Sequence, residues 1–285
     1  MIAIRASQIL TPLTTFENSI LLIEGEKITD LVADQGQSLE GMQIIDTRES
    51  ILAPGMIDVH THGIGGVQTI DGVAEEFATL SEQYAKHGVT SFLATIGGSH
   101  DCIEAGIRAT LACQTPGAEI LGIHLEGPFI NLQRKGAFPP ETIIPPDIEQ
   151  FRKWVELAQG KVRLITIAPE VENALEIIRF AHASGIVCSA GHSQATWEQM
   201  MAAIEAGISH TTHTYNAMLP LDHREPGILG AALTDDRLTC EIIVDGIHVH
   251  PAAIRLLLRS KPHDKVVVVS DSIAATGLPD GVYWF

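Results

Sequence analysis

Two histidines one residue apart, His60 and His62, end a short apolar run within the stretch LAPGMIDVHTHGIGG. Because side chains at positions i and i+2 of a strand point to the same face, this stretch places two imidazoles side by side. Such a pair forms a metal-binding edge, since histidine is the commonest metal ligand. Two buried, hydrogen-bonded histidines would give the same local pattern, so the pair alone does not decide between these readings.

Imidazole and carboxylate groups recur at the ends of the later apolar runs. They belong to His124, Glu126, His192, His210, His213, Asp245, His248, His250 and Asp271. These side-chain types bind divalent transition metals. Their number favours a metal site over a purely structural interior.

The elements that must position these residues follow from the hydrophobic pattern. From Ile57 onward, eight apolar runs alternate with amphipathic segments, several of which end in glycine. This alternation predicts an α/β fold, a (β/α)8 TIM-like barrel, with the active site at the C-terminal ends of the strands. A structural barrel interior would be filled by branched apolar residues, so the polar strand ends indicate function.

The N-terminal segment has a different pattern. Residues 2 to about 50 read as short strands, including a hairpin that turns at Gly25. We expect residues 1–52 to form a separate β unit and residues 53–285 to form the barrel. No helix is expected after the eighth strand, so the barrel is predicted to lack its last helix and the N-terminal strands some of their partners.

Some of the polar residues have a structural interpretation. His124 and His210 lie in the inner parts of their strands and are expected to be core or supporting groups. His250 precedes Pro251 at a helix start and is expected to be structural. The fourth run, VRLITIAPE, contains no lysine that could be carboxylated to bridge two cations, so Glu126 is the expected bridging group.

Composition limits the classes of partner. The chain carries 35 acidic and 18 basic residues, a formal net charge of −17, which excludes nucleic acid as an expected partner. No apolar run is long enough to cross a bilayer, and the first residues lack the features of a signal peptide. The four cysteines have no CxxC spacing, which suits reduced thiols and predicts a cytoplasmic protein without membrane association.

Several motifs occur together in a particular order: PGMIDVHTHG, HLEGPF, KGAF, AGHS, THTYNAM, HREPG and DGIHVHP. In this order they resemble the N-acetylglucosamine-6-phosphate deacetylases of the amidohydrolase superfamily, over essentially the whole chain. The resemblance implies hydrolysis of a linear amide, in which N-acetylglucosamine 6-phosphate gives glucosamine 6-phosphate and acetate during amino-sugar catabolism. It also implies a small β-sandwich built from both termini, of which residues 1–52 would be the N-terminal part.

The resemblance implies one or two divalent ions, zinc or iron. Glu126, His192 and His213 would hold the main ion. His60 and His62 would hold a second ion, which is shared through Glu126.

The resemblance also implies the catalytic and substrate-binding residues. Asp271 would take a proton from water and later donate it to the leaving amine. His248 would polarise the acetamide carbonyl. Asn216 and Ala217 would contact the phosphate, and Arg224 would pair with it from a neighbouring subunit, which implies a homodimer.

One residue departs from the family pattern and keeps alternatives open. Phe138 follows KGA, where relatives usually have a histidine that helps to hold the sugar. Phenylalanine cannot make that hydrogen bond, so N-acetylgalactosamine 6-phosphate is an alternative substrate. Another amide hydrolase is disfavoured by Arg224, because a neutral substrate does not need it. An inactive, truncated metal-binding barrel is the remaining alternative.

Overall fold

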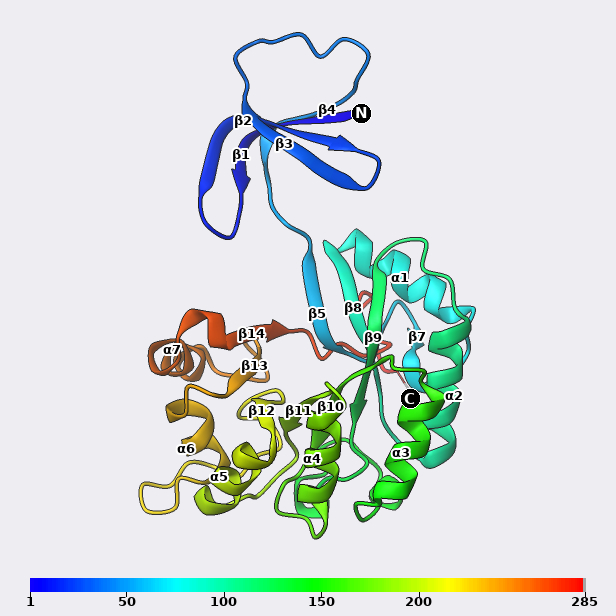
Figure 1. Cartoon of the computed structure of the whole chain (residues 1–285), viewed down its shortest axis with the longest axis vertical. Helices are drawn as coiled ribbons and strands as arrows, with labels where there is room; N and C mark the ends of the chain where they lie inside the picture. Colours follow the sequence, from blue (N-terminus) through cyan, green and yellow to red (C-terminus); the bar gives the residue numbers. More distant parts are fainter. Residues whose placement is uncertain (284–285) are drawn as a thin grey trace. The chain divides into compact units, whose positions relative to one another are not determined.

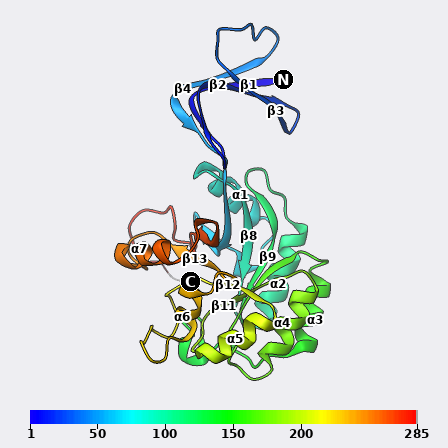
Figure 2. The same ribbon diagram turned by 60° about the vertical axis from the view of Figure 1, so that its left-hand side comes forward.

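The computed structural model describes residues 1–283. The chain divides into two compact units, Met1–Met56 and Ile57–Phe285. The last two residues of the range predicted as a barrel, 53–285, lie outside the described residues. Figure 2 shows both units.

The first unit is a four-stranded sheet. Its strands are β1 (Ile2–Leu10), β2 (Thr15–Glu24), β3 (Lys27–Ala33) and β4 (Gln43–Leu52), in the order β3-β2-β1-β4. The pairs β1–β2 and β2–β3 are antiparallel, as expected for hairpins, whereas β1 and β4 are parallel. The assignment of this sheet to a β-sandwich stays a prediction.

The second unit contains an eight-stranded sheet whose strands follow one another in chain order (Figure 1). They are β5 (Met56–Thr61), β8 (Val89–Ile96), β9 (Glu119–Glu126), β10 (Val162–Ile167), β11 (Val187–Ala190), β12 (Ile208–Thr211), β13 (Thr239–Ile243) and β14 (Val266–Val269). The ladders from β8 to β14 are parallel. A small hairpin, β6 (Gly63–Ile64) and β7 (Val67–Gln68), follows β5.

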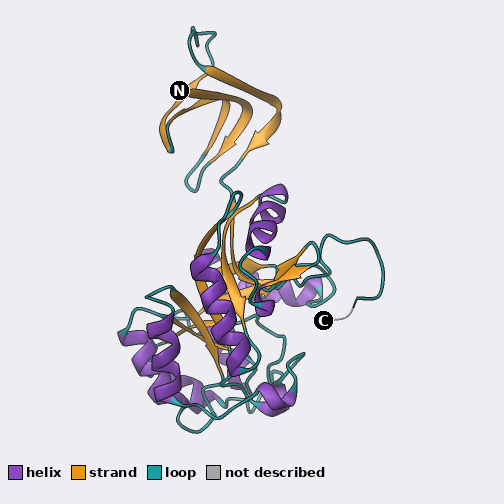
Figure 3. Ribbon diagram, turned by 90° about the vertical axis from the view of Figure 1, so that its right-hand side faces the viewer, coloured by secondary structure: helices purple, strands orange, loops and turns teal. Residues whose placement is uncertain are grey.

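Helices follow the strands and surround the sheet (Figure 3). They are α1 (Glu76–Lys86), α2 (His100–Ala112), α3 (Ile148–Leu157), α4 (Ala174–Ala183), α5 (Trp197–Ala206), α6 (Gly227–Thr234) and α7 (Pro251–Ser260). Short 3₁₀ turns are η1 (Thr69–Asp71), η2 (Leu132–Arg134), η3 (Pro140–Thr142) and η4 (His263–Lys265). Local sequence sets their ends: Thr196 and Gln199 form a capping box at the start of α5.

The main hydrophobic core lies between helices and strands. It includes the fully buried Phe129, Phe151 and Trp154, with Phe129 stacked on Trp154. The interior of the barrel is more polar than the branched apolar layers usual for this fold. His124 bonds to Thr95 through Nδ1 and to Thr166 through Nε2, and Thr166 bonds on to Thr212.

The two ends of the sheet meet where β5 and β14 finish. The backbone N–H of Asp271 donates to His60 O at 2.9 Å, and that of His62 donates to Ser272 O at 2.8 Å. Asp58 accepts hydrogen bonds from the Ser270 side chain and backbone. These bonds bring the segment after β14 against the end of β5, and they place Asp271 beside the two histidines.

The sequence prediction of a TIM-like (β/α)8 barrel is confirmed: the structure is a nearly closed parallel barrel with helices. Within the described residues 270–283, no helix follows β14. β12 ends at Thr211 and β13 ends at Ile243, so these two strands are shorter than the apolar runs suggested. His213 and His248 therefore lie in the segments after these strands. Among the described residues, no helix is long and apolar enough to span a membrane.

Candidate metal centre

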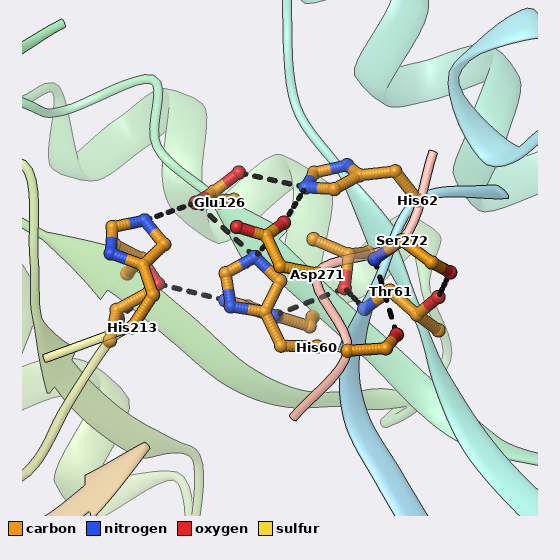
Figure 4. Close-up of polar contacts among 12 residues, drawn as sticks. His60, Thr61, His62, Glu126, His213, Asp271 and Ser272 are labelled. Carbon is orange, nitrogen blue, oxygen red and sulfur yellow. Dashed lines mark hydrogen bonds and ion pairs between the residues drawn. The ribbon is translucent and has the colours of Figure 1, made fainter. Parts of the chain in front are cut away.

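Glu126, at the end of β9, lies at the centre of a group of imidazoles (Figure 4). Its Oε1 atom is 3.2 Å from the Nε2 atoms of both His192 and His213, and 3.3 Å from His60 Nε2. Its other oxygen, Oε2, is 3.1 Å from His62 Nε2. One buried carboxylate therefore contacts all four histidines that the family resemblance names as metal ligands.

The first group of possible metal ligands consists of Glu126, His192 and His213, all buried. The Nε2 atoms of the two histidines face each other at 3.1 Å. His192 donates from Nδ1 to the carbonyl oxygen of Arg134 at 2.8 Å. That bond fixes the ring and leaves the Nε2 lone pair for a metal ion.

The second group consists of His60, His62 and Asp271. Asp271 Oδ1 lies 3.4 Å from His60 Nε2 and 3.3 Å from His62 Nε2. Figure 4 shows these side chains and Glu126 pointing toward one another. Asp271 and His62 have side chains that are 24% and 22% exposed, whereas His60 is fully buried, so solvent reaches the centre at Asp271 and His62.

The donor set fits a divalent metal ion. A neutral imidazole carries one N–H, so an Nε2 atom that donates to the carboxylate oxygen has no lone pair left for a metal ion. The three Nε2 atoms around this one oxygen therefore cannot all donate to it and also keep their lone pairs. His60 Nε2 and His213 Nδ1 are buried atoms without a well-formed hydrogen bond within the described chain. Nitrogen and oxygen donors at this density are the ligands of zinc and of iron.

Three residues of the two groups have left-handed backbone conformations. The φ angles are 48° at His192, 29° at His213 and 49° at Asp271. Residues other than glycine seldom adopt such angles, and they do so at sites where the surrounding structure holds them. The backbone therefore turns sharply after β11, β12 and β14, where it presents these side chains to the centre.

The charges of the centre compensate one another. Burial lowers the pKa of His60, but the Asp271 and Glu126 carboxylates outweigh it and raise that pKa well above its usual value. Burial also opposes the charged form of His62, yet hydrogen bonds to Asp271 and Glu126 raise its pKa to about 9. Burial would raise the pKa of both carboxyls, and the imidazoles, His60 foremost, hold both below their usual range. A cation that binds here therefore displaces protons.

Two further carboxylates support the centre, and the sequence interpretation missed both. Glu170, after β10, accepts hydrogen bonds from the Asn131 side chain, the Ser193 hydroxyl and the Gln194 backbone, which fixes the loops around His192. Glu241, in β13, is fully buried and contacts His60. The sequence contains a signal for each residue. Glu170 ends the fourth apolar run, and Glu241 is a charged residue within the seventh apolar run.

Part of the expected substrate site lies against the first group. The Phe138 ring meets the His192 ring edge to face, with centroids 5.3 Å apart. A Cβ atom added at Gly136 would lie 3.1 Å from the His192 ring and 3.9 Å from Ala217. Nδ2 of Asn216, three residues after His213, is buried and has no hydrogen-bond partner among the described residues, so it is a free donor.

The other two expected substrate residues lie in exposed loops. His248 is 59% exposed, and its Nδ1 bonds to Asp245 Oδ2 at 2.7 Å. Arg224 is exposed, and its backbone N–H donates to Asp222 at 2.8 Å. No recorded contact among residues 1–283 joins either side chain to the two metal groups.

The histidines with a structural interpretation behave as expected. His124 is fully buried in the hydrogen-bonded barrel interior, and burial lowers its pKa well below the usual value. His210 is partly buried and contacts the Ser209 hydroxyl at 3.1 Å. His250 caps α7, with Nδ1 accepting from the Ala252 backbone.

The chain is similar to proteins of known family. The Amidohydrolase family matches residues 51–282. The N-acetylglucosamine-6-phosphate deacetylase of Bacillus subtilis (strain 168) is 40% identical over 284 residues, which cover 97% of this chain and 72% of that protein. The N-acetylgalactosamine-6-phosphate deacetylase of Escherichia coli O157:H7 is 39% identical over 246 residues, which cover 85% of this chain and 65% of that protein.

A solved structure resembles the whole chain. It is a mutant N-acetyl-D-glucosamine-6-phosphate deacetylase from Mycobacterium smegmatis in complex with N-acetyl-D-glucosamine-6-phosphate. It is 32% identical, with a TM-score of 0.91, and the match covers 99% of this chain and 74% of that one. The sequence motifs, the barrel and these similarities agree: the chain belongs to the N-acetylglucosamine-6-phosphate deacetylase family of the amidohydrolases.

Proposed function

We propose that this chain hydrolyses the acetamide of N-acetylglucosamine 6-phosphate, giving glucosamine 6-phosphate and acetate in amino-sugar catabolism. The observation that carries the proposal is Glu126, a member of the first ligand group whose two oxygens also contact His60 and His62 of the second group. The Asp271 carboxylate lies at the solvent-accessible side of this centre. The similar proteins named for this activity support it. The four free cysteines suit a cytoplasmic location, which we also propose.

The centre would bind one or two zinc or iron ions. Glu126, His192 and His213 would hold the first, and His60 and His62 the second, with Glu126 shared. A bound ion supplies Lewis acidity, which activates water and polarises the amide carbonyl at neutral pH.

Asp271 is the proposed general base and acid. It takes one proton from water as the new C–O bond forms. It then returns that proton to the nitrogen as the C–N bond breaks, so the amine leaves neutral. The imidazoles keep the pKa of Asp271 low, so it begins as a carboxylate able to accept the proton.

The remaining proposed roles concern the substrate. His248 would polarise the acetamide carbonyl, held by Asp245 through its Nδ1 atom. Asn216 has a free buried amide donor suited to a phosphate oxygen, and Ala217 lies beside it. Arg224 would give the phosphate a bidentate partner.

The test is direct. The purified chain, stripped of metal and reloaded with Zn²⁺ or Fe²⁺, is incubated with N-acetylglucosamine 6-phosphate, and acetate release is measured. We expect metal-dependent turnover, with much less from unphosphorylated N-acetylglucosamine. Absence of turnover with either ion would favour the inactive metal-binding barrel.

Phe138 favours N-acetylgalactosamine 6-phosphate as a second candidate substrate. Its ring packs against His192 and above Gly97, where an added Cβ would lie 2.7 Å from the Phe138 ring. An apolar wall discriminates between hydroxyl epimers poorly, by about 1–3 kcal/mol. We therefore expect similar kcat/KM values for the two epimers in the parent chain, and greater selectivity in Phe138→His.

The matched control is Phe138→Leu, which keeps an apolar wall and should leave the epimer ratio unchanged. A parent chain that is already strongly selective, with a ratio unmoved by Phe138→His, would show that this position does not read the sugar.

Arg224 is proposed to reach the active site of a second subunit in a homodimer. Arg224 lies in an exposed loop before α6, a position from which its side chain can extend toward another subunit. Mixing Arg224→Ala chains with Asp271→Asn chains should then restore part of the activity, because some hybrid sites carry neither substitution. Dimers of both parents that mix freely and regain no activity would contradict this sharing.

A further inference from the structure

Glu241 is a buried carboxylate to which neither the motifs nor the proposed mechanism gives a role. It lies in the middle of β13 (Thr239–Ile243), is 0% exposed, and is flanked by the buried residues Cys240 and Ile242. A buried charge is costly unless it is paired and hydrogen-bonded. Its contacts should therefore explain why a carboxylate stands at this position.

One oxygen of Glu241 touches both metal groups. Oε2 lies 3.1 Å from Nδ1 of His60, which belongs to the second group. The same oxygen accepts from the backbone N–H of His213, which belongs to the first group, at 3.3 Å. The other oxygen, Oε1, is buried and has no hydrogen-bond partner among the described residues.

The bond to His60 decides which way that ring faces. With Nδ1–H donating to Glu241, Nε2 points toward Glu126 Oε1 at 3.3 Å and Asp271 Oδ1 at 3.4 Å. Its edge-to-face contact with His124, at a centroid distance of 4.6 Å, restricts the ring on one side but supplies no acceptor for Nδ1. A carboxylate behind a ligating histidine fixes its ring orientation and raises its basicity.

We propose that Glu241 is a positioning residue that aims His60 at the second metal ion and ties this ligand to the backbone of His213. The inference deepens the proposed function, on which it rests, because it concerns the same two metal groups. His192 is held instead by the Arg134 carbonyl, so the first group has its own support. Glu241 should therefore govern the second ion more than the first.

Two conservative variants separate position from charge. Glu241→Gln keeps an oxygen acceptor at the same reach and removes the charge. Glu241→Asp keeps the charge and withdraws the acceptor by one methylene. If the position of the acceptor matters, the Asp variant should be worse than the Gln variant, whereas a purely electrostatic role predicts the opposite order.

The experiment is a Zn²⁺ titration of the metal-stripped chain against a chromophoric chelator, with metal content measured after dialysis. The His62→Ala variant lacks one ligand of the second group, so it identifies which binding step of the Zn²⁺ titration belongs to that group. We expect two Zn²⁺ per parent chain and a 10- to 100-fold weaker second step in Glu241→Asp, the usual effect of losing such a partner. The first step should change little, and Glu241→Gln should lie close to the parent.

Several outcomes would overturn the proposal. They are a single Zn²⁺ in the parent chain, a second step in Glu241→Asp equal to that of the parent, or a Gln variant weaker than the Asp variant. Equal weakening of both steps with a lower unfolding temperature would show a role in folding only. If Glu241→Asp does not fold, Glu241→Met, which keeps the length without an acceptor, replaces it in the same comparison.

Acetate release is measured separately on the same proteins. A parent chain that binds two Zn²⁺ but releases no acetate would reject the proposed function and leave the Glu241 result standing. A parent that releases acetate while its Glu241 variants bind Zn²⁺ normally would reject only the inference.

Discussion

Replacement of Asp271 by asparagine should lower kcat by about 100- to 10,000-fold, the usual contribution of a general acid-base group. The amide of asparagine cannot take a proton from water or return one to the leaving amine. The fold should survive, because Asp271 has a φ angle of 49° and asparagine is among the residues that tolerate this left-handed conformation. Acetate release under saturating substrate measures the effect.

A matched control is Asp101→Asn, the same chemical change at a fully exposed position on α2. It should leave kcat unchanged. Metal content and unfolding temperature of Asp271→Asn are measured alongside, since Asp271 also lies within 3.4 Å of His60 and His62. A variant that keeps its metal and retains near-parental kcat would remove Asp271 from the proton transfer.

The barrel and much of the metal centre could be predicted from the sequence by one rule about the ends of parallel strands. Parallel strands end at one edge of a barrel, so polar residues that follow successive apolar runs must gather there. Glu126, at the end of β9, and His60, near the end of β5, illustrate it, since their side chains lie 3.3 Å apart although 66 positions separate them. No local pattern was needed beyond the alternation of strands and helices.

The turns that present the ligands could not be predicted in the same way. His192 and His213 adopt positive φ angles, for which the sequence carries no signal because the usual marker, glycine, is absent at these positions. His248 and Arg224 lie in loops beyond the strands, where the strand-end rule no longer fixes direction. Their roles rest on the motifs alone.

Glu241 could not be predicted from the strand-end rule. Its charge lies near the beginning of the run CEIIVDGIHVH, whereas the candidate polar residues Asp245, His248 and His250 lie toward the end of that run. Only the three-dimensional register shows that this side chain points inward to His60. A lone carboxylate within an apolar barrel strand is therefore a signal for a group that supports the site.

Replacement of Glu126 by alanine should remove both metal ions and reduce acetate release to background. Oε1 of Glu126 contacts His192, His213 and His60, and Oε2 contacts His62, so this one carboxylate reaches the Nε2 atoms of the histidines in both groups. Without it, four imidazoles face one another in a buried space with less negative charge to offset a cation. The loss of activity should exceed that of Asp271→Asn, because the Lewis acid is lost together with the ligands.

His62→Ala is the comparison that makes this prediction specific, because it removes a ligand of the second group alone and should leave one ion bound. Metal content after dialysis against buffered Zn²⁺ separates the two variants, with about two ions expected for the parent, one for His62→Ala and none for Glu126→Ala. Circular dichroism establishes that each remains folded. A folded Glu126→Ala chain that still holds two ions would show that the carboxylate lies between the groups without bridging them.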